Sequence, residues 1–430
     1  MSLTQRFVWL TLAGLVPVVL FPSWWTPALV AAALAAAAAA DVALAPSPRA
    51  VVVERTLPRS VRLGEPATAR LLLTNAGRRR LRGQLHDGWQ PAAGAARTVF
   101  AVDLPPGERR AFDVPLLPRR RGDLAAHHAT VRSRGPLGLA CRQLTHAAPG
   151  TLRVLPPFHA KRHLPSKLQR LRELDGRAAI QVRGAGTEFD SLRDYVRGDD
   201  VRSIDWRATA RRQNVVVRTW RPERDRRVVI VLDTSRTSAA RVGDEPRLDT
   251  GIEASLLLAV LAERGGDRVD FLAYDRRPRA RVDSASRGAL LTRLVEAMAP
   301  LEPELIEADW TDIPSRIHAI SSHRSLVVLL TSLDSGAVEE GLLPVLPGLV
   351  AKHVLVVAAV RDPELAARRG DLRTVGGVYR SAAAERSLQQ REALKNQLRS
   401  MGAEVVDEEP LDLPPALADT YIRLKATGRL

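Results

Sequence analysis

The sequence predicts a multidomain protein with an N-terminal transmembrane helical hairpin, a β-sandwich and a doubly wound α/β domain. Two uncharged apolar runs, 7–21 and 26–40, each approach the roughly 20 residues that a membrane-spanning helix needs. Short alternating runs separated by turn residues follow over 50–155, which is typical of a sandwich. Beyond residue 226, apolar runs alternate with helical patterns, which indicates a mostly parallel sheet.

Composition limits the classes of site that the chain can hold. The single cysteine, Cys141, excludes an internal disulfide framework and a cysteine-based zinc site. The net charge of +16 comes almost entirely from arginine. Its short basic clusters lack interleaved aromatic residues, so the sequence predicts no specific nucleic-acid partner, although electrostatic binding to nucleic acid stays a third and weaker hypothesis. The same charges favour an anionic membrane leaflet.

Residues 1–45 are predicted to form two transmembrane helices that root the chain in the lipid bilayer. A cleaved signal peptide is the alternative, but the apolar stretch is about twice as long as a signal-peptide core and is interrupted at 22–25. Arg6 precedes the hairpin, Arg49 and Arg55 follow it, and the turn carries no charge. The positive-inside bias therefore predicts a multi-pass protein of the cell membrane with its bulk in the cytoplasm. Three tryptophans lie near the predicted interfaces: Trp9, Trp24 and Trp25.

Residues 50–155 are predicted to form an immunoglobulin-like β-sandwich, and 156–182 a helical linker. The expected strands are 51–53, 69–73, 97–102, 110–114 and 128–131. The α/β domain is expected over 227–430. Its expected strands are 228–232, 269–274, 279–282, 326–330, 354–360 and 404–406, and its expected helices are 249–263, 288–298, 313–320, 338–349, 382–401 and 415–425.

Glycines, acids and arginines crowd the segment 183–226. Its prominent residues are Gly184, Gly186, Glu188, Phe189, Arg193, Tyr195, Gly198, Asp199, Asp200, Arg202, Asp205, Trp206 and Arg211. Because each acid lies within a few residues of an arginine, we expect salt bridges to hold this segment in a fixed structure, which we call the buckle. Asp200 is expected to cap a helix over 201–211, and Trp206 to fill a groove on the α/β domain. The alternative is a metal-dependent hydrolase that uses the carboxylates of Glu188, Asp199, Asp200 and Asp205.

This ordered segment, together with the paired apolar helices, Gly135-Pro136-Leu137-Gly138-Leu139 and the α/β domain, resembles the bacterial family known as domain of unknown function 58. The first strand of the α/β domain ends in Asp233-x-Ser235-x-Thr237, which resembles the metal-ion-dependent adhesion site of von Willebrand factor type A-like domains. The resemblance implies a membrane-attached protein that is associated with a MoxR-type AAA+ ATPase and has no settled enzymatic activity.

Asp233, Ser235 and Thr237 alternate along an extended turn, so their oxygens can converge on Mg²⁺, or on Ca²⁺ or Mn²⁺. The resemblance implies a threonine and an aspartate from later loops as further ligands. Thr311 is placed to be that threonine, and Asp334 to replace the aspartate, because Ser332 stands where related domains carry Asp. In the alternative interpretation, Asp233 caps the following turn and the hydroxyls bond backbone amides.

These observations predict a membrane-anchored, non-enzymatic adaptor for protein binding. The family resemblance implies an AAA+ ATPase, or a client of one, as its partner. The sequence contains no Gly-x4-Gly-Lys-Ser/Thr loop, no His-Glu-x-x-His and no Gly-x-Ser-x-Gly, so those nucleotide-hydrolysing, zinc-protease and serine-hydrolase mechanisms are not predicted. No oligomeric state follows from the sequence.

Overall fold

Two compact units, 1–157 and 158–430, make up this computed structural model, and each is described by itself. The structure describes residues 2–181, 188–196, 199–212, 214–221, 226–283, 288–370 and 373–430. Gly184, Gly186 and Gly198 of the predicted signature lie outside these ranges.

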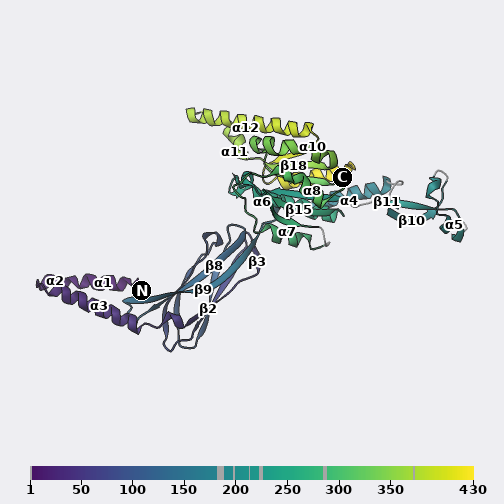
Figure 1. Cartoon of the computed structure of the whole chain (residues 1–430). Coiled ribbons are helices and arrows are strands. Elements are labelled where there is room, and N and C mark those ends of the chain that lie inside the picture. The colour runs from purple at the N-terminus through teal and green to yellow at the C-terminus, as the bar shows by residue number, and fades with distance from the viewer. Residues whose placement is uncertain are drawn as a thin grey trace. The chain divides into compact units, whose positions relative to one another are not determined.

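The first unit begins with the apolar helices α1 (Gln5–Ala13), α2 (Leu15–Leu20) and α3 (Thr26–Leu44). Within the described residues, one helical segment, Thr26–Ala50, is long and apolar enough to cross a membrane. The other arm, Gln5–Leu20, is a shorter apolar helix. The arms lie side by side (Figure 1), and Gly14 permits this because a Cβ there would lie 2.9 Å from Cγ1 of Val30.

A two-sheet sandwich follows these helices. One sheet has the order β1-β9-β8-β5-β6, with β3 also pairing with β9, and the other has the order β2-β4-β7. The strands are β1 (Ser2–Leu3), β2 (Val51–Thr56), β3 (Ser60–Arg62), β4 (Ala67–Asn75), β5 (Leu81–Asp87), β6 (Val99–Leu104), β7 (Arg109–Leu116), β8 (Gly122–Arg134) and β9 (Ala140–Leu155). Along β4, buried residues alternate with more exposed ones, so Leu71 and Leu73 enter the core while their neighbours face outward.

The second unit is built on one six-stranded sheet of order β16-β15-β12-β17-β18-β19. Its strands are β12 (Arg227–Asp233), β15 (Arg268–Tyr274), β16 (Pro278–Val282), β17 (Leu326–Leu330), β18 (Val354–Val360) and β19 (Glu404–Glu408). All neighbours pair in parallel except the antiparallel edge strand β16. The predicted strands of this domain are confirmed, because runs such as Leu326–Leu330 are buried on both faces.

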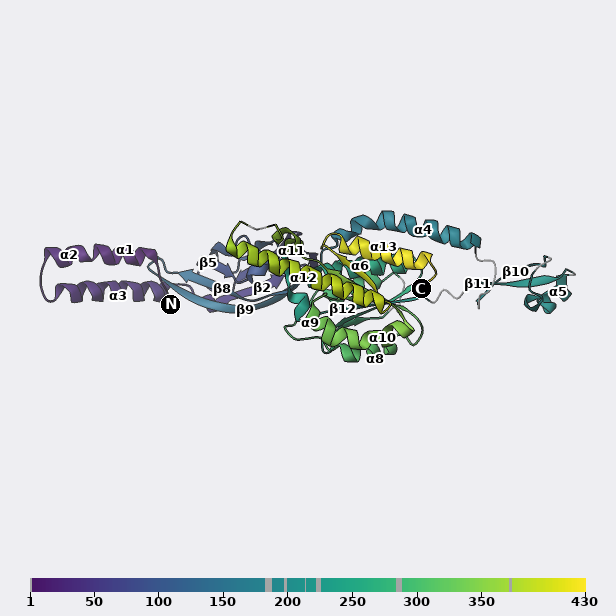
Figure 2. The same cartoon turned by 90° about the horizontal axis from the view of Figure 1, so that it is seen from above.

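Helices cover both faces of this sheet. Figure 2 shows α6 (Arg247–Arg264) and α13 (Leu413–Ala426) on one side of β12, and α8 (Ile313–Ile320) and α10 (Leu343–Lys352) on the other. Further helices of the unit include α4 (Leu164–Gln181), α7 (Leu290–Met298), α9 (Ser335–Ala337), α11 (Pro363–Arg368) and α12 (Val375–Ser400). Val229 and Val231 pack into a core with residues of α8, α10 and α12, because alternate residues of a strand share one face.

The prediction of a helix over 201–211 is wrong in its extent. A short 3-10 turn over Val201–Ser203 precedes a separate helix, α5 (Trp206–Arg212), which lies by β11 (Val216–Arg221). β11 pairs with β10 (Glu188–Asp194) in a small antiparallel sheet. Trp206 leaves 66% of its surface exposed rather than being enclosed as predicted, because it is the first residue of a seven-residue helix that has little core to join.

Candidate functional site

The candidate site lies at the carboxyl end of the central strand β12. β15 and β17 flank β12 on opposite sides, so the chain order reverses at this point of the sheet. Open parallel sheets bind ligands at such switch points, outside the carboxyl ends of the strands. Asp233 ends β12, and Thr331 follows β17 directly, so the topology itself brings these two residues together.

Asp233 gathers three hydroxyl groups and one amide around it. Its Oδ1 accepts a hydrogen bond of 2.8 Å from the amide of Ser235. Its Oδ2 accepts one of 3.0 Å from Oγ1 of Thr237 and one of 2.7 Å from Oγ1 of Thr331. Oγ of Ser235 lies 3.2 Å from Oγ1 of Thr237. The structure therefore brings together the predicted triad of Asp233, Ser235 and Thr237, and it adds Thr331, which the sequence analysis missed.

The carboxylate of Asp233 is almost fully buried, with 3% of the residue exposed. Burial raises the pKa of Asp233, and the hydrogen bonds from the surrounding hydroxyls and the Ser235 amide oppose that rise. No Lys, Arg or His in the described part of the unit forms an ion pair with it. The other buried carboxylates of the unit are paired with cations: Asp267 with Lys425, Asp270 with Arg227, Asp275 with Arg279, and Asp407 with Arg391.

A small cavity of about 20 Å³ adjoins Asp233, which is room for roughly one water molecule. Ser332 and Arg247 line this cavity together with Thr237 and Thr331. Oγ of Ser332 and Nε of Arg247 are buried, and neither finds a hydrogen-bond partner among the described residues. The cavity therefore presents further polar atoms beside the Asp233 carboxylate.

Thr311 and Asp334, the two other predicted ligands, make their contacts elsewhere. Thr311 is exposed, and its hydroxyl donates a hydrogen bond of 2.5 Å to Oδ1 of Asp309. Oδ2 of Asp334 lies 3.2 Å from Nη1 of Arg247 in an ion pair. Neither residue has a contact with the Asp233 carboxylate among those that the structure gives for it.

The donor set suits a hard cation that keeps several water ligands. It offers one carboxylate and the hydroxyls of Ser235, Thr237 and Thr331. Mg²⁺ is commonly bound by one or two carboxylates together with water. Within the described residues, no group of three or more His, Cys, Asp or Glu side chains could hold a metal ion, so a cation here would depend on hydroxyl and water oxygens. Magnesium binding stays a prediction.

The predicted buckle is present among the described residues of the signature segment. Arg193 donates two hydrogen bonds to Asp199, of 2.6 and 2.8 Å, and they hold the pKa of that carboxyl below its usual value. Asp205 accepts from the amides of Arg207 and Ala208 and from Nε of Arg218, and the Ala208 amide and the Arg218 side chain keep its pKa low.

These contacts favour a structural role for the acids. Asp200 accepts from the amide of Arg202, as an N-cap does, and the amide of Tyr195 donates to the carbonyl of Val215. A general acid needs a raised pKa, so the lowered pKa values of Asp199 and Asp205 make them unsuited to that role in a hydrolase. Phe189 and Glu188 contribute backbone to β10, and Arg211 lies in α5.

Comparison with known proteins places this arrangement in a family. Residues 191–399, which hold most of the buckle and the whole Asp233 cluster, match the family described as protein of unknown function DUF58. The chain belongs to the DUF58 family. Uncharacterized proteins of Mycobacterium tuberculosis and Mycobacterium bovis are 25% identical to it over 250 residues, which cover 58% of this chain and 70% of theirs.

Two solved structures each resemble part of this DUF58 protein. A CARDB domain from Pyrococcus furiosus, determined in complex with di-metal ions, covers 26% of the chain and 94% of its own, with 15% identity and a TM-score of 0.20. An α-2-macroglobulin from Escherichia coli also covers 26% of the chain and 18% of its own, with 20% identity and a TM-score of 0.22. Scores this low carry no argument about function.

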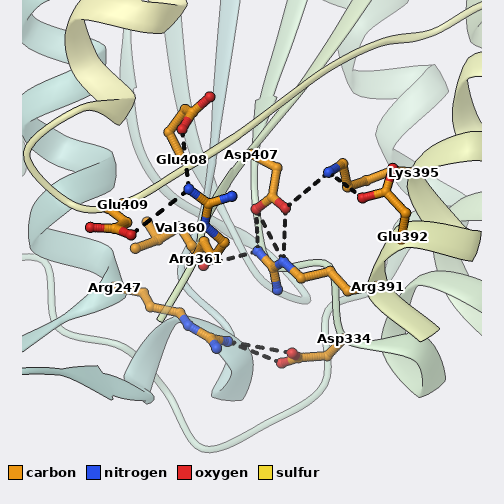
Figure 3. Close-up of polar contacts among 10 residues, drawn as sticks. All are labelled: Arg247, Asp334, Val360, Arg361, Arg391, Glu392, Lys395, Asp407, Glu408 and Glu409. Carbon is orange, nitrogen blue, oxygen red and sulfur yellow. Dashed lines mark hydrogen bonds and ion pairs between the residues drawn. The ribbon is translucent and has the colours of Figure 1, made fainter. Parts of the chain in front are cut away.

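A charged network lies beside the site in the DUF58 protein, near the carboxyl ends of β18 and β19 (Figure 3). The guanidinium of Arg391 from α12 donates to Asp407 of β19 and to the carbonyl of Val360 in β18. Nζ of Lys395 lies 3.6 Å from the same carboxylate. Arg391 and Asp407 are both buried, so this pair fixes α12 to the sheet edge.

Proposed function

We propose that this DUF58 protein is a membrane-anchored, non-enzymatic interaction module whose α/β domain binds an acidic side chain of a partner through a divalent cation. Asp233, Ser235, Thr237 and Thr331 would hold the cation, which we take to be Mg²⁺. This is the role of the metal-ion-dependent adhesion site in von Willebrand factor type A-like domains, which this domain resembles in its doubly wound sheet and its Asp-x-Ser-x-Thr motif.

The lack of a cationic partner for Asp233 among the described residues supports the proposal more than any other observation. Every other buried aspartate in the described part of the α/β unit lies within 4 Å of a cationic side chain, and Asp233 does not. Removing an ionised carboxylate from water is costly unless a counter-charge or several hydrogen bonds compensate it. A bound cation would supply the missing charge at a switch point, where ligands of open sheets are found.

The bound cation would act as a Lewis acid that joins two carboxylates. Asp233 and the hydroxyls would fill only part of its coordination shell, and water the remainder. An acidic side chain of the partner could replace one of those waters. The released water would leave to solvent and no covalent bond of the partner would change, in keeping with a binding module and with the paired acids of the signature segment.

Membrane attachment is supported by the apolar segment Thr26–Ala50. We extend it to a two-helix anchor in which Gln5–Leu20 forms the second arm and the bulk of the chain faces the cytoplasm. Arg55 does not support this orientation as predicted, because it lies in a buried ion pair with Asp87 and offers no free charge. Arg6 and Arg49 still flank the helices. The family resemblance leads us to name a MoxR-type AAA+ ATPase, or one of its clients, as the partner.

The proposal is tested by adding Mg²⁺ to the detergent-extracted full-length chain and following its thermal unfolding. At a concentration 100 times Kd, a ligand that binds only the folded state stabilises it by about 2.7 kcal/mol. We expect this stabilisation in the wild type and its loss in Asp233→Ala. The matched control is Asp283→Ala, which removes a half-exposed carboxylate of the same domain, and it should keep the response.

Recovery of the ATPase in pull-downs then separates the partner from the metal. We expect recovery with Mg²⁺ and loss with a chelator or in Asp233→Ala. Equal recovery in all samples would reject the metal-dependent interaction. If Mg²⁺ stabilises the wild type but no ATPase is recovered, then the cation site stands and the partner is wrong.

A further inference from the structure

A groove of about 500 Å³ lies where α3 meets the sandwich. Its wall on α3 consists of Ala38, Ala39, Val42 and Ala43. Its other side is formed by Ser2 and Leu3 of β1 and by Ala140 and Arg142 of β9. A volume of this size is within the usual range of small-molecule sites, which is roughly 300–1,000 Å³.

The lining is apolar except for Ser2 and one cation. Alanine side chains leave space beside α3 that larger residues would fill. Arg142 makes no hydrogen bond or ion pair that the structure gives within the described residues, whereas Arg132 on the neighbouring strand β8 donates to Gln143. The groove therefore combines an apolar wall with an arginine whose charge has no counter-ion in the described part of the chain.

The position of the groove along α3 matches the edge of a bilayer. A helix rises 1.5 Å per residue, so Ala38 to Ala43 lie roughly 18–26 Å along the axis from Thr26, near the far side of a hydrocarbon core about 30 Å thick. Two other arginines lie near the same end. Arg79 donates to the carbonyl of Leu44, and the guanidinium of Arg6 lies beside Gly138.

Asp41, the one acidic residue of α3, should repel an anionic ligand only weakly. Asp41 is fully buried and accepts hydrogen bonds from the amides of Leu137, Leu139 and Ala140, at 2.7, 2.7 and 2.9 Å. Three amide donors stabilise the charge of a carboxylate. These bonds also hold α3 against β9, so they fix the walls of the groove.

From these contacts we infer that the groove binds one anionic phospholipid of the surrounding bilayer. An acyl chain lies against the alanines of α3 and Leu3, and the headgroup phosphate pairs with Arg142. This inference rests on the membrane attachment proposed above, but not on the cation site or the ATPase. The charge of the groove selects an anionic lipid over a zwitterionic one.

The test is native mass spectrometry of the detergent-solubilised full-length chain, titrated with phosphatidylglycerol or with phosphatidylcholine. We expect a one-to-one adduct that favours phosphatidylglycerol. Arg142→Gln should weaken the phosphatidylglycerol adduct by about fivefold, the equivalent of about 1 kcal/mol for one arginine at a membrane surface. Arg142→Lys should retain the preference, and Ala39→Leu, which fills the groove, should weaken both adducts.

Arg132→Gln is the matched control. Arg132 pairs in register with Gln143, the residue after Arg142, so its side chain lies on the other face of the sheet. It should leave both adducts unchanged. Equal binding of the two lipids by the wild type, or an unchanged preference in Arg142→Gln, would overturn the lipid site. Membrane fractionation distinguishes failure of the lipid site from failure of the proposed membrane attachment. Loss of the wild-type chain from the membrane fraction would refute the attachment itself.

Discussion

The buried pair of Arg391 and Asp407 allows a prediction whose size follows from the structure. Asp407 accepts hydrogen bonds of 2.7, 3.0 and 3.1 Å from Arg391, and the two side chains are only 7% and 3% exposed. Asp407→Ala would leave Arg391 buried with the carbonyl of Val360 as its remaining acceptor, and Lys395 would keep only its ion pair with Glu392. Removing one partner of a buried ion pair costs about 3–5 kcal/mol.

This loss should be visible in two measurements on the full-length protein. Each kcal/mol lowers Tm by about 2–4 °C in a domain of this size, so the α/β unit of Asp407→Ala should melt roughly 6–20 °C lower than the wild type. Hydrogen exchange in α12 should accelerate, because the pair attaches this helix to β18 and β19. The double variant Arg391→Met/Asp407→Leu removes both charges and should recover most of the loss.

Glu392→Ala is the control on the same helix. Glu392 pairs with Lys395 at 2.6 Å, but its side chain is 55% exposed, so its loss should cost under about 1 kcal/mol. If Asp407→Ala and Glu392→Ala melt at the same temperature, with equal exchange in α12, the reasoning from burial is refuted.

Three further predictions concern single sites. Burial raises the pKa of Asp233, so protonation of Asp233 stabilises the fold at low pH, and this stabilisation is lost as the pH rises through the folded-state pKa. In the presence of a chelator, the Tm of Asp233→Asn relative to the Tm of the wild type should therefore rise with increasing pH. Asp41→Ala leaves three amides without their acceptor, so exchange over 137–140 should accelerate and the sandwich should melt lower. Burial and the Asp312 carboxylate raise the pKa of Tyr274 to about 12, so Tyr274→Phe should remove a phenolate that appears only at about pH 12 in an absorbance titration of the folded protein.

The α/β domain was predicted well because its strands are buried on both faces. Such strands form continuous apolar runs, and β17 and β18 begin and end where those runs do. The helix α12 was less predictable and begins at Val375, seven residues before the expected start. Gly376 and Gly377 conceal its first turn, although Thr374 accepts from the amide of Gly377 as an N-cap.

The sandwich was predicted in class but not in detail. β8 and β9 form one long antiparallel pair, where the sequence pattern predicts a single short strand over 128–131. Turn-forming residues inside these strands obscure the pattern, as Pro149 and Gly150 do in β9. The pairing tolerates an irregularity at this point, since the register shifts between Ala126 and His128.

The candidate site shows which contacts local sequence can and cannot predict. Ser235 and Thr237 were found because they alternate along the segment that leaves β12, which is a local property. Asp334 was assigned by extending the alternation of β17, but that strand ends at Leu330, so period two no longer governs the residues beyond it. Thr331, the first residue past the strand, points its hydroxyl at Asp233 instead. The strand order is what makes Thr331 a neighbour of Asp233, and it follows from pairings about 100 residues apart in the chain. A hydroxyl directly after a buried strand was the available signal, and it acquires meaning only when that strand is known to lie next to β12.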